Sequence, residues 1–220
     1  MQDSSPPTGT DLPKPSAGRV IVHPLVVRVT HWVSAFALGC MVLSGWQIYD
    51  ASPLLPFRFP AWATLGGWLG GGIAWHLAAM WLLVGNALIY FAYGIFGRHF
   101  RRTLLPVSPR EIGRDLGQAL TFRLKHKLGT YNAVQRLLYL VVLLLGIVAF
   151  LSGLGLWKPV QVQLLDDLVG GYPVMRWIHF FAMSGIVGFF VIHMLLVLVV
   201  PQTLPAMITG RATIKPEQVQ

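Results

Sequence analysis

The sequence predicts an all-α integral membrane protein, a bundle of four transmembrane helices with both termini in the cytoplasm. Its 220 residues are 55% hydrophobic and only 11% charged, a balance that a soluble domain of this size would not tolerate on its surface. Four apolar stretches reach the length of about 20 residues that a spanning helix needs. Fourteen of the seventeen Lys and Arg residues fall on one side of these stretches, and the positive-inside rule assigns that side to the cytoplasm of a bacterial inner membrane.

The first predicted helix, residues 25–49, follows a polar segment rich in Pro and Ser. Residues 1–18 lack the basic start, apolar core and cleavage site of a signal peptide, so we expect a disordered cytoplasmic tail. The helix runs outward to Trp46 and Tyr49, whose amphipathic rings suit the far interface. A Pro-rich outer loop, residues 50–59, then leads toward the second helix.

The second and third predicted helices, residues 68–95 and 134–156, are joined by a long basic connection. Because such a length is unusual for a simple link, we expect part of the connection to be helix lying on the membrane surface. The fourth predicted helix covers residues 175–200. The membrane domain thus spans residues 19–212, and residues 213–220 form a second cytoplasmic tail. We find no internal repeat convincing enough to use.

The net charge of +9 indicates membrane lipids as partners and not nucleic acid. The basic residues lie in the tails and in the long connection, not on one folded soluble face, so they suit anionic headgroups. The single cysteine, Cys40, lies within the first predicted helix. There is therefore no disulfide framework and no CxxCH motif, and any haem must be bound non-covalently.

Four of the seven histidines lie within the predicted helices, where an ionisable side chain is costly and usually functional. His179 and His193 are 14 residues apart, so they share one helix face within about 40° and differ in depth by about 21 Å. From the helix directions, His31 lies at the inner depth of His193, and His76 at the outer depth of His179. Each pair can supply two axial imidazoles to one haem iron, which leaves no open position and gives an electron-transfer site.

Two other interpretations of these histidines stay open. They could hydrogen-bond across the bundle, although independent packing residues are not expected to match in depth two by two. They could line a path for metal ions or protons, although no intramembrane Asp or Glu accompanies them. Small residues are available to face a porphyrin edge or, equally, to let helices pack closely; they are Gly39, Gly45, Gly85, Gly185 and Gly188.

Two arginines, Arg28 and Arg176, lie near the predicted depths of the two haems. A guanidinium there could pair with a haem propionate, and snorkelling to the interface explains each residue equally well. His23 precedes a proline at the membrane edge. His99 and His126 fall in the basic connection, where we expect solvated or headgroup-facing side chains.

The sequence HPLVVRVTHW at residues 23–32, followed by Ser44-Gly45, resembles the first helix of the bacterial cytochrome b561 and nickel-hydrogenase cytochrome b superfamily. The resemblance covers residues 20–212. It implies four helices, two b-type haems and a fourth helix that gives one ligand to each haem. The iron ligands that it implies are His31, His76, His179 and His193.

Residues 131–136, with the sequence YNAVQR, are similar to the Tyr-Asn-Ala-Gly-Gln segment that borders a quinone site in formate dehydrogenase cytochrome b subunits. Carried over, this likeness makes Asn132 and Gln135 candidate quinone contacts. Val134 stands where that segment has its glycine, and Asn132 is equally suited to capping the third helix.

The overall pattern most resembles thiosulfate-reductase-like cytochrome b subunits, which accompany periplasmic molybdopterin oxidoreductases. The resemblance implies a di-haem cytochrome b that transfers electrons between such a periplasmic catalytic subunit and quinone. The chain has no nucleophile-and-base constellation or phosphate loop of its own, so we do not expect it to be catalytic alone. The alternatives are a free-standing superoxide:quinone oxidoreductase of the same superfamily, the cytochrome b subunit of a nickel-iron hydrogenase, and a haem-free anchor or transporter.

Overall fold

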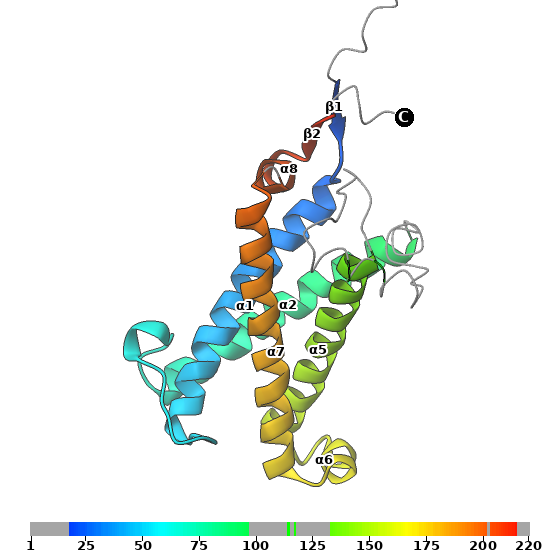
Figure 1. The fold of residues 1–220 in the computed structure, drawn as a ribbon. Helices are drawn as coiled ribbons and strands as arrows, with labels where there is room; N and C mark the ends of the chain where they lie inside the picture. The colour runs from blue at the N-terminus through cyan, green and yellow to red at the C-terminus, as the bar shows by residue number, and fades with distance from the viewer. Residues whose placement is uncertain (1–17, 97–113, 115–116, 118–132, 202, 215–220) are drawn as a thin grey trace, which may run out of the picture.

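A computed structural model of the chain describes residues 18–96, 114, 117, 133–201 and 203–214. Four long helices form most of it, and each is long and apolar enough to cross a membrane. They are α1 (Leu25–Ala51), α2 (Leu69–Phe96), α5 (Ala133–Trp157) and α7 (Tyr172–Val199), shown in Figure 1. The predicted four-helix membrane fold is confirmed, and every predicted helix end lies within three residues of the observed one.

The four helices pack as two pairs, α1 along α2 and α5 along α7. At most 22% of the residues in the apolar core of any span are buried inside the protein. Large apolar side chains instead point outward, among them Trp81, Leu144 and Leu198. This is the arrangement that a lipid solvent favours, because apolar side chains gain nothing by leaving hydrocarbon for a protein core.

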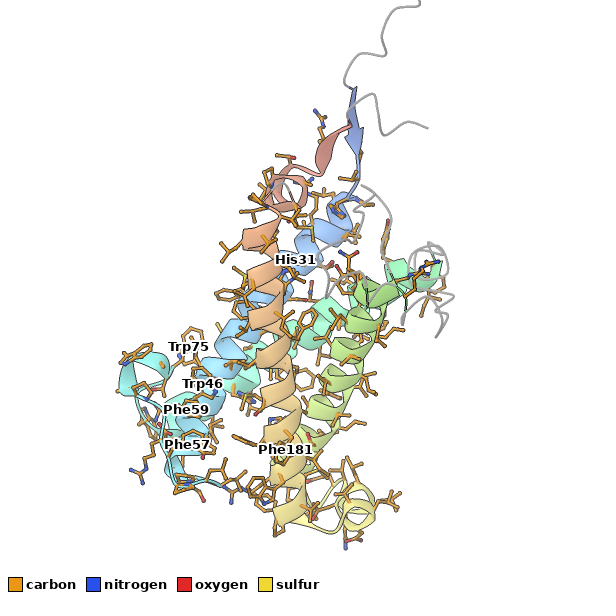
Figure 2. All side chains as sticks on the ribbon, in the orientation of Figure 1. His31, Trp46, Phe57, Phe59, Trp75 and Phe181 are labelled. Atoms are coloured by element: carbon orange, nitrogen blue, oxygen red, sulfur yellow. The ribbon has the colours of Figure 1, made fainter. Side chains whose placement is uncertain are left out.

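At the outer end, the loop after α1 folds back over the helix that precedes it. The Tyr49 hydroxyl accepts a hydrogen bond from the Leu55 backbone N–H at 3.1 Å, and the Asp50 carboxylate accepts one from the Phe59 N–H at 2.9 Å. The Phe59 ring stacks on Trp46 with centroids 4.4 Å apart. Figure 2 labels Trp46, Phe57 and Phe59 close together at this end. Two short helices lie outside the four long ones, η1 (Ala61–Ala63) and α6 (Gln163–Val169).

The start of α2 depends on a glycine turn. Gly66 has a positive φ of 118°, and a Cβ at this position would lie 2.3 Å from the backbone nitrogen of Gly72. Neither the backbone conformation nor the space admits a side chain. The turn at Gly66 therefore sets where α2 begins and, with it, the depth of the residues that α2 carries.

At the inner end, the two ends of the described chain meet. Strand β1 (Gly18–Ile21) pairs antiparallel with β2 (Arg211–Ile214), with Gly18 opposite Ile214, beside the short helix α8 (Thr203–Thr209). The prediction of helices alone did not include this ribbon, because strands of four residues give little periodic signal and their pairing joins opposite ends of the chain. Figure 1 places β1, β2 and α8 opposite α6, as the prediction of both termini on one side requires.

Four expectations lie outside the described residues. They are the surface helix in the connection between α2 and α5, the solvated side chains of His99 and His126, the structure of most of the two tails, and the cap or quinone contact at Asn132.

Candidate functional site

The outer histidine pair faces across the two helix pairs. His76 of α2 and His179 of α7 have ring centroids 6.2 Å apart and an interplanar angle of 68°. An imidazole nitrogen binds a metal at about 2 Å, so two rings that face one ion through a nitrogen have centroids about 6 Å apart. The spacing thus fits one metal ion between the rings.

The hydrogen bonds of His76 determine which of its nitrogens faces its partner. Nδ1 lies 3.0 Å from the Met41 carbonyl oxygen and 3.1 Å from Ser44 Oγ. A carbonyl oxygen can only accept, so Nδ1 carries the proton and donates. The Ser44 hydroxyl donates to the Cys40 carbonyl at 2.5 Å, so its oxygen is a second acceptor for the imidazole. Nε2 is left with its lone pair available to a metal.

His179 is held in the same way by a different helix. Its Nδ1 lies 2.9 Å from the Ala149 carbonyl oxygen and 3.1 Å from Ser152 Oγ. The Ser152 hydroxyl donates to the Val148 carbonyl at 2.6 Å, and its oxygen accepts from the imidazole. Both outer histidines therefore share one tautomer, with the lone pair of Nε2 available to a metal.

Two glycines let the neighbouring helices approach these rings. A Cβ at Gly45 of α1 would lie 3.4 Å from His76 Cε1, and a Cβ at Gly153 of α5 would lie 3.0 Å from His179 Cε1. Contacts at 3.0 Å are tighter than real Cβ atoms usually make, so the ring beside Gly153 would have to move. At Gly153 the missing side chain therefore leaves the room that the His179 ring needs, whereas a Cβ at Gly45 would only touch the His76 ring.

The inner histidine pair has the same spacing and a different environment. His31 of α1 and His193 of α7 have centroids 6.2 Å apart and an interplanar angle of 57°. The Phe189 ring stacks on His193 with centroids 5.9 Å apart. Within the described residues, the buried Nδ1 of His31 has no hydrogen-bond partner. Figure 2 labels His31 toward the β1–β2 end, far from the outer aromatic side chains.

An amide from α2 holds α1 beside the inner pair. Asn86, buried at 7% exposure, donates through Nδ2 to the Thr30 carbonyl at 2.7 Å and to Ser34 Oγ at 2.8 Å. Thr30 immediately precedes His31. No water competes with an interhelical hydrogen bond at membrane depth, so the Asn86 side chain fixes the position of α2 relative to this turn of α1.

The donor set distinguishes haem iron from a bare metal ion. Among the described residues, no group of three or more His, Cys, Asp or Glu side chains is placed to hold a metal. A bare zinc ion takes about four ligands from its surroundings, whereas haem iron already has the porphyrin nitrogens and needs only axial ligands. Two facing imidazoles therefore fit a haem. The buried Nε of Arg28 has no hydrogen-bond partner in the described part of the chain. This N–H group fits an anion such as a propionate nearby.

Comparison with known proteins agrees with this geometry. The family model described as prokaryotic cytochrome b561 matches residues 22–210. The chain belongs to the prokaryotic cytochrome b561 family. It is also 50% identical over 190 residues to the putative protein-methionine-sulfoxide reductase subunit YedZ1 of Azospira oryzae, a match that covers 86% of this chain and 96% of the relative.

The superfamily predicted from residues 23–32 and Ser44-Gly45 is thus confirmed. This cytochrome b561 is a multi-pass protein of the bacterial inner membrane, with b-type haem as the cofactor of its family and electron transfer as its role. The structure brings together the histidines that the sequence paired by depth, His31 with His193 and His76 with His179. Their assignment as iron ligands is taken up below as a proposal.

The two predicted propionate partners of this cytochrome b561 bond to backbone carbonyls. Arg28 donates through Nη2 to the carbonyl of Ile208 at the end of α8. Arg176 donates through Nη2 to the carbonyl of Ser52 at the end of α1, and Ser52 Oγ lies 3.4 Å away. A guanidinium has five N–H donors, so each arginine can hold these segments and still offer donors to an anion.

The predicted small residues divide into three groups. Gly45 faces the ring of His76, and a Cβ at Gly185 would lie 2.9 Å from Leu145, which is close packing of α5 on α7. At the other three positions a Cβ would meet nothing within 4 Å, which leaves open surface on α1, α2 and α7; they are Gly39, Gly85 and Gly188. Gln135, the second candidate quinone contact, is half-buried near the start of α5. The residues of α5 that contact His179 lie toward the other end of this helix.

Sequence reasoning missed the residues that hold the outer histidines in this cytochrome b561. Neither the serines nor the accepting carbonyls of Met41 and Ala149 were candidates. A signal was present, because Leu-Ser-Gly occurs once in α1 and once in α5, at residues 43–45 and 151–153.

Alanine at Gly153 is expected to weaken haem binding at the outer pair by about 10-fold or more, the range that second-shell changes cost at metal sites. The added Cβ, 3.0 Å from His179 Cε1, turns the ring away from its two acceptors. Haem content after detergent purification measures the effect. Gly146→Ala is the control on the same helix, because a Cβ there meets nothing within 4 Å, and Gly45→Ala should fall between the two. Equal haem content in all three variants would contradict the expectation.

Proposed function

We propose that this chain is a di-haem electron-transfer subunit that connects quinone at the inner side of the membrane to a periplasmic catalytic subunit. The observation that supports it is the presence of two histidine pairs with the same 6.2 Å centroid spacing, at two depths about 21 Å apart along α7. His76 and His179 hold the outer b-type haem, and His31 and His193 hold the inner one. When bound, each haem accepts and donates one electron at an iron with no open position.

Arg28 and Arg176 serve as propionate partners in this proposal. Each already lies at the end of the bundle that matches its histidine pair, Arg28 beside α8 and Arg176 beside Ser52. Arg28 offers its buried Nε as a donor with no partner among the described residues. A charge-assisted hydrogen bond to a propionate would satisfy that group.

The quinone site belongs at the inner end, near the start of α5. Gln135 lies there, and we propose it and Asn132 as contacts to the quinone oxygens. An amide side chain can donate to a quinone oxygen and accept from a quinol hydroxyl. Quinol releases two protons and two electrons when it becomes quinone, and a haem held by His31 and His193 would supply the one-electron acceptor for them.

The catalytic partner is a periplasmic reductase, which we place in the molybdopterin class. The relative's name, a protein-methionine-sulfoxide reductase subunit, supports methionine sulfoxide in proteins as the final acceptor. That reaction takes two electrons and two protons, and releases the sulfoxide oxygen as water. One quinol therefore balances one sulfoxide, and electrons flow outward through the chain.

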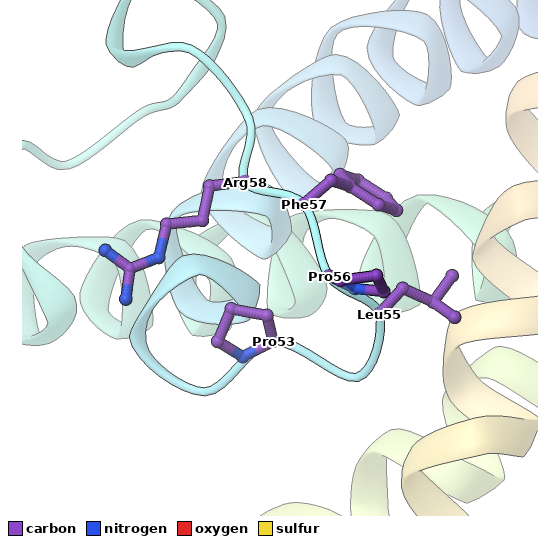
Figure 3. Close-up of a pocket in the computed structure, with 5 residues that line it drawn as sticks. All are labelled: Pro53, Leu55, Pro56, Phe57 and Arg58. Atoms are coloured by element: carbon purple, nitrogen blue, oxygen red, sulfur yellow. The ribbon is translucent and has the colours of Figure 1, made fainter.

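The outer segments offer an apolar surface for such a partner. Trp62, Leu164 and Leu168 are 88%, 75% and 73% exposed. Figure 3 shows a hollow on the outer loop lined by Pro53, Leu55, Pro56, Phe57 and Arg58. In that view the Arg58 side chain points away from Phe57, so a charged group borders the apolar hollow.

The experiment that tests this function uses membranes from cells that express the chain and its native partners. Quinol added to the purified complex is expected to reduce methionine sulfoxide in a protein substrate, read by mass spectrometry. Three outcomes favour the alternatives. Rapid quinone reduction by superoxide with the chain alone supports a free-standing oxidoreductase, and hydrogen-driven haem reduction with a nickel-containing partner supports a hydrogenase subunit. A correctly folded protein without haem would leave only an anchor or transporter.

A further inference from the structure

The two helix pairs carry the same histidine-holding unit. Helices α2 and α7 are both 28 residues long, and the outer histidine is the eighth residue of each. Both histidines are followed by the same spacing of Ala and Met, and both face a Leu-Ser-Gly segment on the neighbouring helix. The matching segments are residues 43–45 with 76–80 in one half, and residues 151–153 with 179–183 in the other.

The contacts match as closely as the sequence. The distances from histidine Nδ1 to the carbonyl oxygen are 3.0 and 2.9 Å, and those to the serine oxygen are both 3.1 Å. In both halves the serine also donates to the carbonyl four residues before it. The outer pair therefore lies between two equivalent halves of an internal repeat, and each half holds one imidazole.

A nearby contact shows that the halves agree in geometry and not only in sequence. A Cβ at Gly72 of α2 would lie 2.9 Å from the Gln47 side chain of α1, and a Cβ at Gly155 of α5 would lie 2.8 Å from the Met175 side chain of α7. Gly72 and Met175 occupy the fourth position of their helices. In one half the glycine lies on α2 and the large side chain, Gln47, on α1. In the other half the glycine lies on α5 and the large side chain, Met175, on α7. The same gap between the helices is therefore filled from opposite sides.

The inner pair does not share this device. The Nδ1 of His31 has no hydrogen-bond partner among the described residues. At the repeat-related positions of the other half stand Tyr139, for His31, and Tyr90, for His193. The serine–histidine unit is thus a property of the outer pair.

We propose that Ser44 and Ser152 are positioning residues that set the reduction potential of the outer haem, an inference that rests on the proposed function above. Each serine oxygen accepts from Nδ1–H and so makes Nε2 a stronger electron donor to iron. A stronger axial donor favours the ferric state over the ferrous state, which lowers the potential. Because the two units are equivalent, each serine contributes about equally.

The test is a spectroelectrochemical titration of the purified full-length chain with both haems. Ser44→Ala and Ser152→Ala are each expected to shift the midpoint of the outer haem to more positive values. The two shifts should be similar in size and add in the double variant, while the midpoint of the inner haem stays unchanged. Both substitutions remove only a hydroxyl from a buried helix position, and each serine carries the test if the other variant fails to fold.

The control is Ser184→Ala, an exposed serine on α7 whose hydroxyl donates at 2.8 Å to the Phe180 carbonyl and hydrogen-bonds to none of the histidines in the described residues. Its midpoints should match the wild type. If both haems are retained and neither serine variant moves the outer midpoint, the inference is wrong while the proposed function stands. If the wild type lacks two b-type haems, the proposed function itself fails. A shift of the same size in Ser184→Ala would also overturn the inference.

Discussion

Alanine at His179 is expected to remove the outer haem and leave the inner haem in place. His179 is one of two imidazoles that fit a single iron, with its Nε2 directed away from the Ala149 and Ser152 acceptors. Loss of one axial ligand from a bis-imidazole site removes a bond that no neighbouring side chain can replace, since the described residues show no third ligand there. Haem content should fall from two per chain to one, measured by reduced-minus-oxidised spectra and haem quantitation.

The pairing also predicts which histidine substitutions remove the same haem. His76→Ala should remove the same spectral component as His179→Ala, and His31→Ala should remove the same component as His193→Ala. Combining His76→Ala with His179→Ala should cost no more haem than either change alone. His126→Ala, in the basic connection, is the control and should retain both haems. Retention of both haems in His179→Ala, or loss of one component by His76→Ala and a different one by His179→Ala, would show the pairing to be wrong.

The helices and the depth of the histidines could be predicted because both follow from local patterns. Apolar stretches of sufficient length define spans in a lipid solvent, and 3.6 residues per turn fixes which histidines share a face and how far apart they lie. Helix direction then pairs residues from different helices by depth. The ribbon of β1 and β2 does not follow from such patterns, because it depends on the two ends of the chain meeting after four crossings.

The hydrogen-bond partners of the outer histidines could not be predicted in the same way. That the Met41 and Ala149 carbonyls are free to accept depends on the rotation of α1 and α5 and on how closely each approaches its neighbour. The rotation and approach of these helices are properties of packing, and Gly45 and Gly153 lie where α1 and α5 come close to the histidine rings. The repeat was visible in the sequence only as isolated matches, and its meaning comes from two sets of equal distances.

The sequence predicts two alternative roles for Arg28 and Arg176, pairing with a propionate or snorkelling to the interface, and neither names the carbonyl groups that they bond. In the structure each ties together segments far apart in the chain, α1 to α8 in one case and α7 to the outer loop in the other. Depth alone predicts that a charge lies at an interface, whereas the carbonyl that it bonds depends on where loops return.

Breaking the inner pair is expected to stop quinol from reducing the outer haem. In His193→Ala the inner ligand set is lost while His76 and His179 keep their hydrogen bonds, because His193 lies about 21 Å along α7 from His179. Quinol-driven reduction of the outer haem should fall by at least about 100-fold, the upper end of what second-shell changes alone cost at metal sites. Dithionite, which needs no specific site, should still reduce the outer haem fully. Stopped-flow absorbance measures the rate of outer-haem reduction by quinol and by dithionite separately.

The opposite variant fixes the direction of the relay. In His179→Ala, quinol should reduce the inner haem at the wild-type rate, while electron delivery to the periplasmic partner stops. If quinol instead reduces the outer haem normally in His193→Ala, quinone binds at the outer side and the placement of Gln135 at that site is wrong. The two substituted histidines lie on one helix and differ only in depth. If His193→Ala blocks reduction of the outer haem and His179→Ala leaves reduction of the inner haem unchanged, the two histidine pairs act in series from the inner to the outer side.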